Sequence, residues 1–310
     1  MSNLDARPAV TECVTSAPAT PEATLFEARE VPLGGIRGIT VSRVLPQRGL
    51  PTIGAWCFLD QFGPSTERMN VLPHPHTGLQ TVTWPIAGEI RHRDSIGSDV
   101  VLKPGQLNLM TSGPGISHSE FSVSTGQMHG LQLWVALPSG VEIEHAFAQY
   151  VTLPSFTVPG LSATVFMGQL GDVVSPATVY TPLVGADLTI SGDATLPLRP
   201  DFEYGLLVLD GSLAAADIEL SRGPLLYLGT GRCSLDISGD ARAVLLGGEP
   251  FPDELVMWWN FVGRSHEDIE AARADWEAQA ARFGSIPFHG TDRIPAPPLP
   301  PIRLTPRKRR

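Results

Sequence analysis

Glycine and proline interrupt this chain so often that few long helices can form in it. The sequence has 31 glycines and 29 prolines in 310 residues, and both residue types break regular structure at turns. Between these breaks lie short apolar or alternating runs such as GITVSRVL, LQTVTWPI and GLQLWVALP. Many short strands separated by turn residues predict an all-β chain folded as a sandwich, barrel or jelly roll.

Two strand-rich stretches, residues 23–140 and 160–250, precede a single helical pattern. The run LVLDGSL in the second stretch loosely resembles WPIAGEI in the first, which favours two copies of one fold. The helix is predicted to begin after Ser265, which forms a capping box with Asp268, and to end at Gly284. Its apolar stripe comprises Ile269, Ala272, Trp276, Ala280 and Phe283.

The two ends of the chain differ in composition from the part between them. Residues 1–22 are rich in Ala, Pro, Thr and Glu without apolar periodicity, and we expect them to be disordered. Residues 286–310 are rich in proline and end in a basic cluster, which predicts an extended tail. The net charge is nevertheless −10. An acidic body argues against binding of nucleic acid or an anionic membrane.

The cysteines and the apolar runs bear on the cellular compartment. Cys13, Cys57 and Cys233 are widely spaced and odd in number, which is typical of free thiols in a reducing compartment. We expect Cys57 and Cys233 to pack as small apolar groups. The start of the chain lacks the apolar core of a signal peptide, and no run approaches the roughly 20 apolar residues of a membrane helix. These features predict a soluble cytoplasmic protein.

Two pairs of metal-binding residue types stand out, each with one residue between its members. They are His74 with His76, and His118 with Glu120. On a β-strand, side chains two residues apart leave from the same face. If the two strands face each other across a barrel, the four side chains can converge on one ion. Three nitrogens and one oxygen suit Fe(II), Mn, Ni, Cu or Zn.

The remaining histidines and the aromatic residues near these pairs have simpler interpretations. His92 is expected on a strand surface, with a supporting role behind the ligands as the alternative. His129 is expected to be a structural histidine with its polar atoms satisfied. Trp84, Met110 and Phe121 are expected in the core, although aromatic walls beside an ion would also suit a flat apolar substrate.

Long stretches of the sequence resemble the pirin family. They are HPHTGLQTVTWPIAGEIRHRD, KPGQLNLMTSGPGISHSE, HGLQLWVALP, and GGEPF followed by WWNFV. The resemblance covers residues 30–285. It implies two cupin β-barrel (jelly-roll) domains, a metal-binding one at 23–140 and one without a metal site at 141–252. A C-terminal helix segment at 253–285 would follow. Residues 160–250 contain no histidine, in keeping with a single metal site.

The resemblance also implies a ligand set and an activity. The family binds iron through three His and one Glu, which here are His74, His76, His118 and Glu120. It is associated with quercetin 2,3-dioxygenase activity, in which a flavonol ring is opened with O₂. Glu120 would also take the proton of the substrate hydroxyl. The alternative is a non-catalytic iron- or redox-responsive regulator that binds a transcription factor or a metabolic enzyme. Gln80 stands where the family usually has Glu, and we expect it to change hydrogen bonds near His76 or the pocket charge, with the ion still bound.

Overall fold

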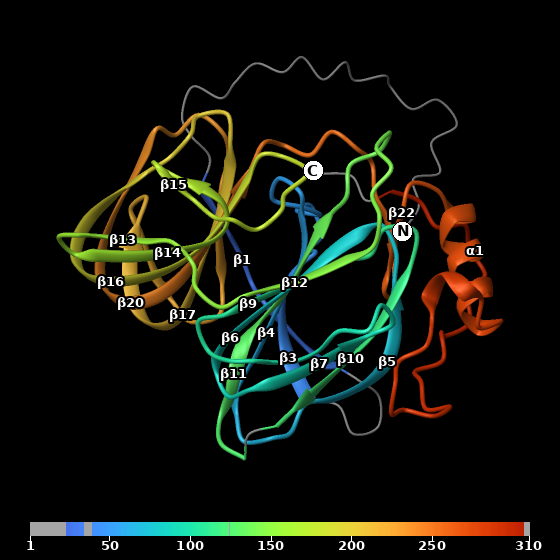
Figure 1. Cartoon of the computed structure of the whole chain (residues 1–310). Helices are drawn as coiled ribbons and strands as arrows, with labels where there is room; N and C mark the ends of the chain where they lie inside the picture. The colour runs from blue at the N-terminus through green and yellow to red at the C-terminus, as the bar shows by residue number, and fades with distance from the viewer. Residues whose placement is uncertain (1–22, 34–38, 124, 307–310) are drawn as a thin grey trace, which may run out of the picture.

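The computed structural model describes residues 23–33, 39–123 and 125–306. The predicted disordered segment 1–22 lies outside these ranges. As predicted, the chain is mostly β-strand, with one α-helix in the described part (Figure 1). No helix there is long and apolar enough to cross a membrane.

The first half of the chain forms two sheets. The seven-stranded sheet has the order β12 (Ala146–Tyr150), β9 (Leu107–Thr111), β6 (Leu79–Ala87), β11 (Met128–Ala136), β4 (Trp56–Ser65), β3 (Ile39–Leu45) and β2 (Arg29–Leu33). The four-stranded sheet has the order β5 (Asn70–His76), β10 (Ile116–Ser122), β7 (Ile90–Asp94) and β8 (Asp99–Leu102).

The two sheets face each other. The Thr83 hydroxyl on β6 donates a 3.0 Å hydrogen bond to Glu120 on β10, and Phe147 on β12 stacks on His92 of β7 with ring centroids 4.4 Å apart. Their facing side chains therefore form one interior. The strand pairings of the described residues do not join either of these sheets into a continuous closed barrel.

The second half forms one large sheet that includes the first described strand. Its order is β1 (Ala23–Phe26), β19 (Leu225–Leu228), β17 (Glu203–Ala215), β20 (Ser234–Gly248), β16 (Leu183–Pro197), β14 (Leu161–Leu170) and β13 (Ser155–Val158), with β15 (Val173–Val174) on β14 and β18 (Ile218–Ser221) on β17. Because β1 pairs with β19, the described chain begins in this sheet before it enters the first half.

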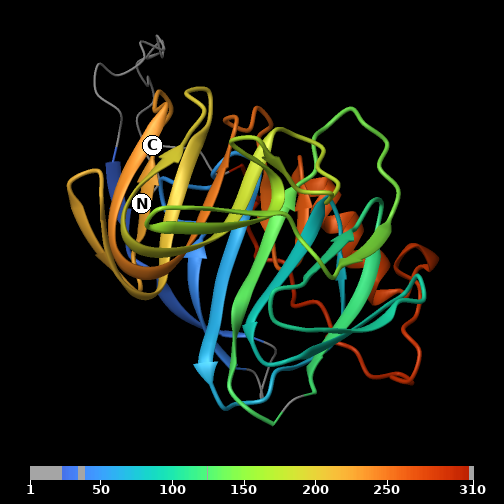
Figure 2. The same cartoon turned by 60° about the vertical axis from the view of Figure 1, so that its left-hand side comes forward.

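The two halves pack side by side through a shared core (Figure 2). Trp56 of the first half lies edge-on to Phe166 of the second, with centroids 6.3 Å apart. Its indole N–H donates to the Val184 carbonyl over 3.1 Å. The buried Glu203 carboxylate accepts a 2.6 Å bond from the backbone N–H of Gly54. Apolar burial and satisfied polar groups thus join the halves at one interface.

The C-terminal helix begins as predicted but ends early. Ser265 and Asp268 form the capping box, and α1 runs from His266 to Glu277. The predicted end at residue 284 is wrong, because Gln279 has φ 54° and turns the chain out of the helix. Phe283 instead lies in the 3₁₀ turn η2 (Ala281–Phe283). It still packs edge-on against Trp276, with centroids 5.6 Å apart.

The segment after the helix is irregular, as predicted for a proline-rich tail, but it is packed down as far as it is described. The indole N–H of Trp276 donates to the Ile294 carbonyl over 2.9 Å. The Ile294 N–H donates to the Pro73 carbonyl over 2.8 Å. This segment therefore ties α1 to Pro73, which directly precedes His74 on β5. Along the chain, the hairpin of β21 (Val256–Trp258) and β22 (Phe261–Gly263) comes after β20, the last strand of the large sheet, and before α1.

Candidate metal centre

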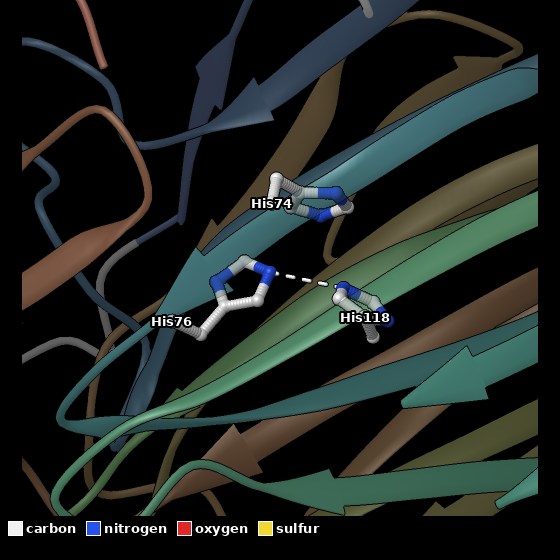
Figure 3. Close-up of side chains that lie close together, drawn as sticks. All are labelled: His74, His76 and His118. Carbon is white, nitrogen blue, oxygen red and sulfur yellow. Dashed lines mark hydrogen bonds between the residues drawn. The ribbon is translucent and has the colours of Figure 1, made fainter. Parts of the chain in front are cut away.

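Three buried imidazoles converge on the inner face of the four-stranded sheet (Figure 3). His74 and His76 lie on β5 and His118 on β10, and one ligating nitrogen from each lies within 4.8 Å of the other two. The Nε2 atoms of His76 and His118 are 3.0 Å apart. The two strands do not face each other across a barrel, which was the arrangement considered for bringing these side chains together. They are hydrogen-bonded neighbours, with His118 opposite His74, and cross-strand neighbours bring their side chains close together.

Hydrogen bonds at Nδ1 fix the tautomer and the ring orientation of the two imidazoles on β5. The Nδ1 of His74 lies 2.9 Å from the Leu72 carbonyl oxygen, and the Nδ1 of His76 lies 3.2 Å from the Asn260 carbonyl oxygen. A carbonyl oxygen only accepts, so both Nδ1 atoms carry the proton. The Nε2 lone pairs are then directed at the cluster.

The Asn260 contact depends on a close approach of the hairpin to the turn after β5. Val262 N–H donates to the Thr77 carbonyl over 3.0 Å. Next to Thr77, Gly78 has φ 70°, and a Cβ there would lie 2.1 Å from the Val262 carbonyl oxygen. A glycine is required at this position because any larger residue would push the hairpin away from His76.

His92 supports the third imidazole from behind, so its predicted place on the strand surface is wrong. It is 1% exposed, and its Nε2 lies 3.1 Å from the Asp94 carboxylate. Its Nδ1 lies 3.4 Å from the Nδ1 of His118. Asp94 accepts the Nε2 proton of His92, whose Nδ1 can in turn accept from His118. This chain leaves the His118 Nε2 as an acceptor directed at His74 and His76.

The predicted carboxylate lies beside this cluster. Glu120 is buried, and it forms a second close group with His92 and His118 in which the ligating atoms lie within 4.8 Å of one another. The register between β5 and β10 shifts between His118 and Glu120 because β5 has one residue more than β10 there, whereas β10 stays in register with β7 and places Glu120 opposite His92. The structure thus has two overlapping groups of three residues that share His118.

Burial keeps the imidazoles neutral and opposes ionisation of the carboxyl group. Desolvation lowers the pKa of His74 to about 4 and holds those of His76 and His118 well below their ordinary value. It raises the pKa of Glu120, against the attraction of His92 and the hydrogen bond from Thr83. Neutral imidazoles offer their lone pairs to a cation.

These residues fit a divalent metal ion. Two neutral Nε2 atoms 3.0 Å apart, both with lone pairs directed at the same point, repel each other unless a proton or a cation lies between them. Metal–nitrogen bonds of about 2.0–2.1 Å bring two ligand nitrogens to about this separation. The nearby carboxylate would supply negative charge and an oxygen donor.

A pocket of about 440 Å³ opens onto the cluster. Trp134 forms part of its wall and lies edge-on to His76, with ring centroids 5.3 Å apart. The hairpin and the C-terminal segment also line the pocket, through Met257, Trp258, Trp259 and Ile294. Trp258 and Trp259 also pack against the cluster that holds α1 onto the body, and the sequence analysis did not place this pair at the pocket. The WWNF run is the signal that could have pointed to it.

Other expectations for single residues had mixed outcomes. His129 is a satisfied structural histidine, with Nε2 2.9 Å from Gln61 Nε2. Trp84 and Met110 are core residues as predicted. Phe121 is only half-buried and stacks on His289. The two cysteines differ. Cys57 is buried as predicted, whereas Cys233 is exposed, contrary to prediction.

Gln80 is buried on β6, away from the cluster it was expected to influence. Its side-chain amide donates to the Thr111 hydroxyl over 3.0 Å and to the Thr178 carbonyl over 3.2 Å. Neither partner belongs to the histidine cluster, and the Nδ1 of His76 is bonded to the hairpin. The effect of Gln80 is therefore on packing between the halves and not on the hydrogen bonds of His76.

Comparisons with known proteins agree with this architecture. A model of the Pirin family matches residues 38–135, and a model of the Pirin C-terminal cupin domain matches residues 184–284. A Pseudomonas aeruginosa protein named "Putative quercetin 2,3-dioxygenase" is 46% identical over 283 residues, or 88% of this chain and 89% of that protein.

Solved structures agree as well. A crystal structure of quercetin 2,3-dioxygenase from Acinetobacter baumannii superimposes with a TM-score of 0.86 at 41% identity, covering 91% of this chain and 97% of the other. The bacterial pirin YhhW from Escherichia coli, crystallised with nickel(II), shares the fold with a TM-score of 0.58 at 16% identity. That match covers 74% of this chain and all of the other.

Proposed function

This chain belongs to the pirin family, and we propose that it is a metal-dependent dioxygenase that opens the ring of a flavonol with O₂. The observation that carries this proposal is the convergence of three neutral Nε2 atoms at the base of a pocket lined by aromatic residues. The relatives named for quercetin 2,3-dioxygenase activity support the substrate class.

The proposed ligands are His74, His76, His118 and Glu120. Fe(II) is the preferred ion, and Mn, Ni, Cu or Zn would suit the same donors. When bound, the metal would lower the pKa of the substrate hydroxyl, orient the flavonol and couple it to O₂. The chain itself would position the metal ligands, bind the flat substrate and accept the proton of the substrate hydroxyl.

Glu120 is the proposed acceptor of the flavonol 3-hydroxyl proton. Its buried position raises the pKa of the carboxyl group, which makes it a better base than an exposed glutamate once it is ionised. The Thr83 hydroxyl donates to its Oε1 over 3.0 Å and so orients it. The other oxygen is left to face a ligand or a proton.

The pocket favours an enzyme over a purely regulatory iron protein. A volume of about 440 Å³ lies within the usual range for sites that bind small molecules, about 300–1,000 Å³. Trp134, Trp258 and Trp259 give it the flat apolar surfaces that a fused aromatic ring system would contact. A regulatory protein that a partner recognises only at its surface would not need such a pocket beside the metal.

Oxygen consumption tests this proposal. Protein loaded with Fe(II) and supplied with quercetin should consume O₂ and release carbon monoxide. Glu120→Gln should lower the rate per bound iron by at least about 100-fold, because it removes the base. Glu142→Gln, at an exposed position, should leave the rate unchanged. Absence of O₂ uptake by protein that holds one iron per chain would contradict the proposal.

A further inference from the structure

A row of polar side chains crosses the inner face of the seven-stranded sheet. Strand register places Arg43 opposite Asp60, Asp60 opposite Gln132, and Gln132 opposite Thr83. Two 2.8 Å hydrogen bonds join Arg43 to Asp60. The Thr83 hydroxyl lies 3.1 Å from Gln132 Oε1 and 3.0 Å from Glu120 Oε1. The row therefore runs from strand β3 to the proposed base.

An aromatic row lies beside it, two residues along each strand and so on the same face. Phe58 is opposite Trp134, and their rings stack with centroids 4.0 Å apart and planes 14° apart. Trp134 contacts His76 at one end. At the other end, Cζ of Arg43 lies 4.6 Å from the Phe58 centroid. All four residues line the pocket, which thus has an aromatic floor running from the candidate metal centre to a guanidinium group.

Arg43 has hydrogen-bonding capacity left over. Its Nε and Nη2 are held by Asp60, and within the described part of the chain no hydrogen bond uses its Nη1. The Arg43 side chain is 25% exposed, whereas that of Asp60 is 1% exposed. Asp60 therefore positions the guanidinium, which can donate into the pocket.

The charge balance indicates which chemical group this donor would recognise. The charges of Arg43 and Asp60 cancel, so the pair offers little net attraction to a second anion. A neutral oxygen that accepts a hydrogen bond from Nη1 suits it better. A phenolic hydroxyl is such a group, and it belongs to a flat ring that the exposed edges of the stacked Phe58 and Trp134 rings can contact in an edge-to-face arrangement.

We propose that Arg43, held in place by Asp60, is a specificity-determining residue that recognises a phenolic hydroxyl on the pendant ring of the flavonol. This inference rests on the proposed function and adds a preference among flavonols to it. Arg43 would bind the substrate without taking part in the chemistry, while the 3-hydroxyl binds at the other end of the aromatic floor.

The test compares two flavonols under anaerobic conditions, where no turnover occurs. Quercetin carries hydroxyls on its pendant ring, and galangin has the same skeleton without them. Binding to the metal-loaded full chain is measured by quenching of tryptophan fluorescence. The native protein should bind quercetin about tenfold more tightly than galangin, the effect of one hydrogen bond from a charged donor. Arg43→Met should reduce that preference to less than about twofold and leave galangin binding nearly unchanged.

Two further variants guard against indirect effects. Arg43→Met leaves Asp60 buried without its partner, so the double variant Arg43→Met/Asp60→Asn removes that charge and should give the same loss of preference. Arg199→Met is the matched control, because Arg199 also pairs with an aspartate, Asp201, and covers an aromatic ring, that of Phe202. It lies in the second half and should keep the native preference.

The outcomes separate the two proposals. Equal affinities for quercetin and galangin in the native protein, or a preference that survives both Arg43 variants, would overturn the role of Arg43 and leave the proposed function standing. Failure of metal-loaded native protein to bind either flavonol would overturn the proposed substrate class and this inference with it.

Discussion

At the scale of single residues, the candidate centre depends on what holds the second nitrogen of each imidazole. Backbone carbonyl oxygens hold His74 and His76, whereas His118 relies on the buried pair His92–Asp94. Hydrogen bonds from Ser98 and His92 outweigh the effect of burial on Asp94, so the pKa of that carboxyl lies below its ordinary value. Asp94 is therefore an ionised anchor for the chain of imidazoles.

Replacing His92 should weaken metal binding without removing a ligand of the proposed set. His92→Phe keeps a ring to stack on Phe147 but leaves His118 without its partner. We expect the metal affinity to fall about 10- to 100-fold, measured by competition with a chelator. His145→Phe, at an exposed position, is the control. An unchanged affinity in His92→Phe would show that His118 needs no support.

His129 should make the stability of the metal-free protein depend on pH. Burial, with help from Arg222 and Arg242, lowers the pKa of His129 to about 4 from an ordinary 6.5. Between these values the unfolded chain binds a proton that the folded chain does not. The contribution to stability is therefore complete above pH 6.5 and is lost as the pH falls towards 4.

Denaturant unfolding of the native protein and of His129→Gln over this range measures the effect. The free energy of unfolding should fall more steeply with decreasing pH in the native protein, by up to about 1.4 kcal/mol per pH unit for one proton. Parallel pH profiles for the two proteins would mean that His129 titrates normally in the fold.

At the scale of elements, the sequence shows which side chains share one face of a strand more readily than it shows which strands pair. The period of two correctly placed His74 with His76 on one face, and the capping box correctly placed the start of α1. Neither pattern says which strands pair, so the adjacency of β5 and β10 was missed. His92 was also missed, because alternation on a strand does not distinguish an inner face from an outer one until the second sheet is in place.

The pocket wall shows a further limit of sequence reasoning. The backbone carbonyl of Asn260 contacts His76 across 184 positions, and Ile294 reaches Pro73 from the far end of the chain. Such contacts arise from tertiary packing and leave no local periodicity. The early end of α1 was hidden for a related reason, since the apolar spacing continued through Phe283 although the backbone turned at Gln279.

The cap of α1 can be tested directly. Ser265→Ala removes the side-chain acceptor for the backbone N–H of Asp268 and should lower the free energy of unfolding by about 1 kcal/mol. Ser285→Ala, just beyond η2 at an exposed position, should change it little. Chemical denaturation measures both. Equal stability of the two variants would mean that packing alone sets the start of the helix.

At the scale of the whole molecule, the two halves behave as one packed body in which only the first carries the histidine cluster. The shared core around Trp56 and Phe166 is joined by the hydrogen bonds of Trp56 to Val184 and of Gly54 to Glu203. An interface that is both apolar and hydrogen-bonded couples the unfolding of its two sides. The second half thus supports the site by stabilising the sheet opposite the ligands.

Removing Trp56 should therefore destabilise both halves together. Trp56→Ala is expected to lower the free energy of unfolding by about 3–5 kcal/mol, with calorimetry still showing one transition at a lower temperature. Phe288→Ala, at a side chain that is 82% exposed, should leave the transition in place. Two separate transitions, only one of which moves, would contradict the coupling.

The most direct test of the central claim is the metal content of the His118→Ala protein. Native protein and the variant are loaded with Fe(II) under anaerobic conditions, freed of unbound metal and analysed by plasma mass spectrometry. Because His118 belongs to both close groups, its loss should reduce bound iron from about one ion per chain to nearly none. His145→Ala, treated in parallel, should keep the native content. A His118→Ala protein that is folded and holds as much iron as the native chain would show that the metal centre lies elsewhere.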